Sequence, residues 1–74
     1  MTIDEFKKNI APFMRKGWVA MDKGGEWRWW QYEPVQIPEE NCWWEIFGDY
    51  IRLSLVFNIE PVEDWTQSLI EVGK

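Results

Sequence analysis

The first sixteen residues alternate apolar and polar side chains with the period of a helix. The apolar stripe consists of Ile3, Phe6, Ile10 and Phe13. Residues 2–5, Thr-Ile-Asp-Glu, have the sequence of a capping box, in which a threonine and a glutamate each bond the other's backbone amide. Pro12 has no amide hydrogen, so the helix should stop or kink near Ala11. The pattern predicts an N-terminal helix that packs its stripe against the rest of the chain.

From residue 18 the apolar period changes from helical to two, which is typical of strands. Two such stretches, 18–22 and 26–32, flank the turn sequence Asp22-Lys23-Gly24-Gly25. Asp22 suits the first position of a type I turn, and Gly25 suits the left-handed position of a bulge. This hairpin puts Val19, Met21, Trp27 and Trp29 on one face and Trp18, Ala20, Arg28, Trp30 and Tyr32 on the other. A two-residue Gly-Gly loop would shift the pairing by one residue; we prefer the first register because it leaves one face entirely apolar.

A second hairpin is predicted between residues 41–47 and 50–58, around the turn Gly48-Asp49. Counting outward from the turn pairs Glu45 with Arg52 on one face, and it pairs large apolar residues on the other. The stretch 33–41 contains two prolines and reads as an extended connection. After Pro61, Asp64 is expected to cap a short C-terminal helix that turns Trp65, Leu69 and Val72 inward.

The fold class that follows is α+β, with residues 1–74 in a single domain. A four-stranded antiparallel sheet made of two hairpins carries the N-terminal helix on one face, and a short C-terminal helix follows. The sheet face that packs against the N-terminal helix is expected to hold Val19, Met21, Trp27, Trp29, Trp44, Ile46, Ile51, Leu53, Leu55 and Phe57. The opposite face mixes rings with charge, and its members are Trp18, Arg28, Trp30, Tyr32, Trp43, Glu45, Phe47, Tyr50, Arg52 and Ser54.

Two interpretations of this mixed face remain open. In the first, the C-terminal helix or the connection around Val35 and Ile37 covers it and makes a second, smaller core, because small domains must enclose most of their large rings. In the second, it is an exposed aromatic patch of the composition that protein interfaces favour at their centres. The candidate binding residues in that case are Trp18, Arg28, Trp30, Trp43, Tyr50 and Arg52.

The charged residues and the single cysteine limit which partners and which kinds of catalytic or metal site we expect. The net charge is −5, and cations gather only in the first 17 residues, so a nucleic acid backbone is a poor partner. The chain has no histidine, and Cys42 is its one cysteine, so no catalytic residues, metal ligands or cofactor are predicted. No stretch resembles a signal peptide or reaches membrane-spanning length, so we expect a cytoplasmic protein without membrane contact.

Two stretches, "WVAMDKGGEWRWWQYEP" and "DWTQSL", form the pattern WxAMDxxGxW…DWxxSL. The matching residues are Trp18, Ala20, Met21, Asp22, Gly25, Trp27, Tyr32, Pro34, Asp64, Trp65, Ser68 and Leu69. On these residues the chain resembles small uncharacterised proteins encoded by bacteriophages and prophages, over about half its length. It departs from them in its extra N-terminal helix and at Gly24, where an acid or asparagine is usual. The resemblance implies a bacterial-cell setting, and a mobile-element accessory protein, but brings no activity or site residues.

The predicted function is that of a small noncatalytic interaction module, not an enzyme, which binds a protein partner through the aromatic sheet face. One alternative is ligand binding by stacking on the same rings, where a sugar is less penalised by the acidic charge than single-stranded nucleic acid. Another is an acidic DNA-mimic inhibitor. The chain is expected to be a monomer or a weak homodimer.

Overall fold

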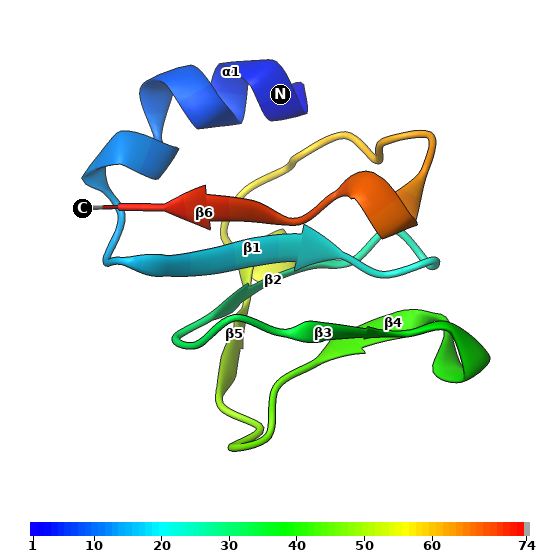
Figure 1. The fold of residues 1–74 in the computed structure, drawn as a ribbon. Coiled ribbons are helices and arrows are strands. Elements are labelled where there is room, and N and C mark those ends of the chain that lie inside the picture. The colour runs from blue at the N-terminus through cyan, green and yellow to red at the C-terminus, as the bar shows by residue number, and fades with distance from the viewer. Residues whose placement is uncertain (74) are drawn as a thin grey trace.

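The computed structural model describes residues 1–73 as a small α+β fold with one α-helix and two antiparallel sheets (Figure 1). The helix is α1 (Ile3–Asn9). The strands are β1 (Gly17–Met21), β2 (Trp27–Trp30), β3 (Val35–Ile37), β4 (Cys42–Trp44), β5 (Tyr50–Arg52) and β6 (Ile70–Val72). Single 3₁₀ turns are η1 (Ala11–Phe13), η2 (Pro38–Glu40), η3 (Leu53–Leu55) and η4 (Trp65–Gln67).

The larger sheet has the strand order β5-β2-β1-β6, with the first hairpin at its centre. Its register pairs Trp18 with Trp30 and Met21 with Trp27, so the predicted pairing of this hairpin is confirmed. The turn forms because the amide of Gly25 donates to the carbonyl of Asp22 at 3.0 Å, with Gly25 at a φ of 89°. Adjacent rings in β2 therefore point to opposite faces of the sheet.

The predicted second hairpin is wrong. Strand β4 pairs with β3, and β5 pairs with β2, so the segment around Gly48 and Asp49 is a wide loop between two sheets. Strands β3 and β4 form a two-stranded ribbon, joined through η2 and Asn41, which has a left-handed φ of 57°. The ribbon lies beneath β1 and β2, on the side away from α1 (Figure 1). Glu45 and Arg52, predicted as a cross-strand pair, are therefore not partners.

Helix α1 begins with the predicted capping box. The Glu5 amide donates to the Thr2 hydroxyl at 3.1 Å, and the Thr2 amide donates to the Glu5 carboxylate at 2.9 Å. The helix ends at Asn9, and Pro12 lies in the separate turn η1. Phe6 is fully buried in the main core, but Phe13 is 86% exposed, because η1 turns its ring away from the predicted stripe.

The predicted C-terminal helix is also wrong. Asp64 does cap the segment by accepting from the Thr66 amide at 3.0 Å, but the capped element is the single turn η4. The chain then extends into β6, which pairs antiparallel with β1. Val72 is buried as predicted, although from a strand that completes the sheet.

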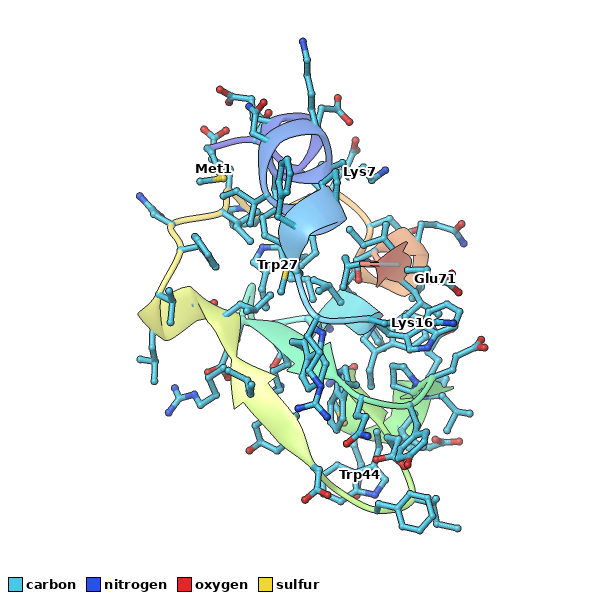
Figure 2. The ribbon with its side chains drawn as sticks, turned by 90° about the vertical axis from the view of Figure 1, so that its left-hand side faces the viewer. Met1, Lys7, Lys16, Trp27, Trp44 and Glu71 are labelled. Carbon is cyan, nitrogen blue, oxygen red and sulfur yellow. The ribbon has the colours of Figure 1, made fainter. Side chains whose placement is uncertain are left out.

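The main core lies between α1 and the upper face of the larger sheet, and Trp27 lies in it below the helix (Figure 2). Its buried members are Phe6, Ala11, Val19, Met21, Trp27, Trp29, Leu53, Ile59 and Val72. The predictions for Trp44, Ile46, Ile51 and Leu55 are wrong, since all four are exposed. Their predicted place in the core depends on the second hairpin, which does not form.

Candidate interaction surface

The ribbon covers the centre of the mixed face of the larger sheet. Trp30 is only 1% exposed and Trp43 only 7%, so the interpretation of these two rings as open surface is wrong. Trp30 packs edge-on against Trp44, with centroids 6.0 Å apart, and against Tyr50 at 4.9 Å. The ribbon thus covers part of this face, as the first interpretation expected, but the covering residues are Trp43 and Trp44 of β4, whereas Val35 is exposed.

Trp43 fixes the ribbon to the larger sheet by hydrogen bonds as well as by packing. Its indole N–H lies 3.1 Å from the carbonyl of Met21 and 3.3 Å from that of Trp65. Its ring meets Trp65 edge-on at 6.2 Å. A buried indole N–H usually finds such an acceptor, and the two bonds tie Trp43 to the larger sheet, so Trp43 serves the fold.

Two predicted binding residues, Arg28 and Arg52, are directly opposite each other in the pairing of β2 with β5. Like charges at such positions repel, and Glu26 relieves the repulsion by pairing with Arg28 at 2.6 Å and also with the Nε of Arg52. Arg28 pairs further with Asp22 at 2.8 Å and lies 5.1 Å over the ring of Tyr50. Burial works against the charged form of Arg28, but the hydrogen bond that Arg28 donates to Asp22 and the charges of Glu26 and Asp22 outweigh the effect of burial and raise the pKa of Arg28.

A cavity of about 150 Å³ lies between the sheet and the ribbon, beside this network. Its lining residues are Asp22, Arg28, Trp30, Cys42, Trp43, Trp44 and Tyr50. The Nε of Arg28 and the Nε1 of Trp30 are buried donors with no partner among residues 1–73. Burial, followed by the charge of Glu40, raises the pKa of the Cys42 thiol, which disfavours the nucleophilic thiolate. The cavity has room for a small hydrogen-bond acceptor. Its lining residues do not include a nucleophile with a general base beside it.

Large apolar side chains gather at the end of the molecule opposite α1. We call this surface the aromatic tip; its residues are Tyr32, Val35, Trp44, Ile46, Phe47 and Tyr50, all of them exposed. The rings of Tyr32 and Phe47 are 5.4 Å apart, and Val35 is directly across the ribbon from Trp44. Figure 2 shows Trp44 at this end, beside the loop that joins β4 to β5. Of the predicted binding residues, Tyr50 belongs to the tip.

Trp18 lies at the edge of the mixed face, near Tyr32 of the tip. It is half-buried and lines a hollow of about 480 Å³ together with Lys16, Gly17, Gln31, Tyr32 and Glu71. The structure thus separates the six predicted residues into two buried rings, two paired arginines, one tip residue and one residue of this hollow.

Sequence reasoning missed Trp44 and Ile46 as surface residues, because a hairpin at Gly48-Asp49 would have buried both, and it placed Phe47 on the mixed face but not among the candidate binding residues. No local signal separates this loop from a tight hairpin, because Ile46 and Phe47 directly precede an acceptable two-residue turn. Gly48 does take a left-handed φ of 72°, but within a wider loop.

Comparisons of this chain with protein-family models, with curated proteins and with solved structures found no match. Within residues 1–73, no helix has the length and apolar character that crossing a membrane requires. The same residues contain no cluster of three or more His, Cys, Asp or Glu side chains placed to hold a metal ion.

Proposed function

We propose that this chain is a small noncatalytic interaction module that binds a protein partner through the aromatic tip. The observation that carries the proposal is the exposure of six large apolar side chains at one end of a 74-residue chain. Soluble monomers rarely expose contiguous apolar patches of this kind unless the patch contacts something else. The resemblance to phage and prophage proteins is compatible with a bacterial protein as the partner.

Two hydrogen bonds within the loop of the tip order its backbone, which favours binding because less ordering is then needed when a partner binds. The amide of Phe47 donates to the buried carboxylate of Glu45 at 3.0 Å, and the amide of Gly48 donates to the Glu45 carbonyl at 2.9 Å. The rings of Trp44 and Tyr50 both pack against the buried ring of Trp30. The mixed face therefore supports the binding surface from beneath, while the loop and the strand ends present it.

The test is a pull-down from bacterial lysate, quantified by mass spectrometry, with the chain and a tip variant carrying Ile46→Ser and Phe47→Ser. Both residues are exposed, so the variant should keep the circular dichroism spectrum and unfolding midpoint of the parent. Loss of two interface anchors typically costs about 2 kcal/mol or more, so capture should fall by about 30-fold or more.

The matched control carries Leu55→Ser and Val56→Ser, which removes two exposed apolar residues from the η3 segment instead. Control and parent should capture the same proteins in equal amounts. Equal capture by the tip variant, or no protein enriched by the parent, would refute the proposal.

A second candidate is supported by the hollow at Trp18, where two rings lie among a lysine, a glutamine and a glutamate. Aromatic faces with donors and acceptors around them suit a neutral sugar, and the acidic net charge does not oppose it. Titration of the chain with soluble oligosaccharides, followed by tryptophan fluorescence, should then give saturable changes that Trp18→Ala abolishes. Fluorescence unchanged at millimolar sugar would eliminate this candidate.

A further inference from the structure

We infer that the partner of the β5 edge is a second copy of this chain, which adds its own β5 strand antiparallel about a two-fold axis at Ile51. The inference rests on the proposed function, because it names one partner for the tip end of the molecule. Edge strands with unpaired backbone groups are templates for such pairing. The case depends on which backbone groups face outward and on whether the edge complements itself.

The outward groups follow from the alternation of hydrogen bonds in the larger sheet. The Asp22 amide donates to the Glu26 carbonyl at 3.0 Å, so the next bonded pairs along the hairpin are Ala20 with Arg28 and Trp18 with Trp30. The amides of Trp27 and Trp29 therefore face β5, as the bond from the Trp27 amide to the Ser54 hydroxyl at 2.9 Å confirms.

Strand β5 then directs the backbone groups of Ile51 toward Trp29, its partner in β2. The backbone groups of Tyr50 and Arg52 face away from the sheet. No turn, loop or cap within residues 1–73 bonds them. Two donors and two acceptors thus lie in a row along one open edge.

The opposite edge of the sheet is less available. By the same alternation, only Glu71 of β6 directs its backbone groups outward. The neighbouring amide of Gly73 is used within the chain, where it donates to the carbonyl of Ala11 in η1 at 3.0 Å. The fold closes this edge with the N-terminal segment and leaves the β5 edge open.

The β5 edge is complementary to itself. In an antiparallel pair centred on Ile51, Tyr50 of each copy is opposite Arg52 of the other, and the two residues exchange both backbone bonds. Four hydrogen bonds form, and each Arg52 guanidinium lies beside a tyrosine ring, a favourable contact for a cation. Within each chain Glu26 neutralises Arg52, so the two edges do not repel each other through like charges.

The side chains at this edge are accessible. Tyr50 is 41% exposed and Ile51 is 55% exposed, so the two copies would bury apolar area at the axis. Because each edge strand has only three residues, the contact is small. Such small interfaces are weak, and we expect a dimer with a Kd on the order of micromolar or higher.

Disulfide trapping tests the register. In a Cys42→Ser background, Ile51→Cys brings two thiols together at a non-bonded pair, where Cα atoms are close enough for a disulfide. Mild oxidation should give a covalent dimer on a non-reducing gel. The matched control, Cys42→Ser with Leu55→Cys, places an exposed thiol off the edge and should cross-link at least ten-fold more slowly.

Sedimentation equilibrium of the unmodified chain provides the second measurement. The parent should show reversible dimerisation, and Ile51→Lys should abolish it by placing two charges at the axis, with its circular dichroism spectrum unchanged. A monomer at millimolar concentration, or equal cross-linking of the two cysteine variants, would overturn the inference. A monomeric parent whose capture of lysate protein still depends on Ile46 and Phe47 would leave the proposed function standing.

Discussion

The hydroxyl of Ser68 lies between the two backbone groups of Met21. It accepts the Met21 amide hydrogen at 2.8 Å, and its own hydrogen is within reach of the carbonyls of Met21 at 3.1 Å and Trp65 at 2.6 Å. A serine side chain thus continues the β1–β6 ladder where β6 has not yet begun. It also joins the two halves of the WxAMDxxGxW…DWxxSL pattern, since Met21 belongs to the first and Ser68 to the second.

Replacing Ser68 by alanine should destabilise the fold by about 1–3 kcal/mol, because the buried Met21 amide loses its acceptor. Urea unfolding followed by circular dichroism measures the change. Ser54→Ala is the matched control: Ser54 accepts the Trp27 amide in the same way, but from an exposed position. An equal loss in both variants would contradict the role given to burial.

Gly17→Ala should also destabilise the chain, by about 1–3 kcal/mol or more, because the added methyl meets atoms that cannot move aside. A Cβ at Gly17 would lie 2.5 Å from the Trp30 carbonyl oxygen and 2.6 Å from the Trp29 ring. Thermal unfolding gives the measurement, and Gly24→Ala, whose Cβ would meet only the Asp22 side chain at 3.3 Å, is the control. An unchanged midpoint for Gly17→Ala would show that this contact is looser than described.

Glu26→Gln removes the charge that holds Arg28 and Arg52 together. We expect a loss of about 1 kcal/mol in urea unfolding at low salt, since two arginines remain opposite each other without their shared carboxylate. The loss should shrink in 1 M salt, where such repulsion is screened. Glu39→Gln, on the exposed turn η2, should have no effect at either salt concentration. A salt-independent loss would indicate that shape rather than charge is responsible.

The capping box makes stability depend on pH through Glu5. Its hydrogen bonds with the backbone and side chain of Thr2 lower the pKa of the Glu5 carboxyl below its ordinary value. A folded pKa below the unfolded one means that the unfolded chain binds more protons, so the stabilisation is present above the ordinary pKa and is lost as pH falls through the lowered value. Glu5→Gln should be less stable than the parent at pH 7 and equally stable in strong acid. A difference that is constant from pH 7 to pH 2, measured by urea unfolding, would contradict this assignment.

Cys42 should react slowly with alkylating reagents. Burial and the nearby charge of Glu40 raise the pKa of its thiol, so less thiolate is present at pH 8 than in the unfolded chain. We expect the pH midpoint of iodoacetamide modification, followed by mass spectrometry, to be higher for the native chain than for the chain in urea. A lower native midpoint would indicate an activated thiol and would reopen a nucleophilic role for this residue.

The elements predicted correctly from sequence are those whose signals are local. The capping box at Thr2 and the turn at Asp22–Gly25 each fix a backbone conformation within four residues, so neighbouring side chains suffice to identify them. Once that turn is set, the alternation of side chains separates Trp29 from Trp30 onto opposite faces. The coarse fold class follows from one helix and this hairpin.

The elements predicted wrongly depend on pairings between distant segments. Gly48-Asp49 has the residues of a tight turn, but the strands beside it pair with β2 and β3 instead, and Trp44 and Tyr50 then pack against the ring of Trp30. Ile70–Val72 forms a strand because β1 offers it an edge, which no local pattern reveals. The candidate site shifted for the same reason: the ribbon buried Trp30 and Trp43 and left the β4–β5 loop outside.

The contact between the ribbon and the larger sheet differs from the contacts between neighbouring strands, which are ladders of backbone hydrogen bonds. Among residues 1–73, a single hydrogen bond between backbone groups crosses it, from the Lys23 amide to the Asn41 carbonyl. Rings and the Trp43 indole make the rest of the contact. Separating the ribbon from the sheet would break the Trp43 indole bonds and the ring contacts but no strand ladder, so hydrogen exchange within β1 should stay slow even if water reaches Trp30.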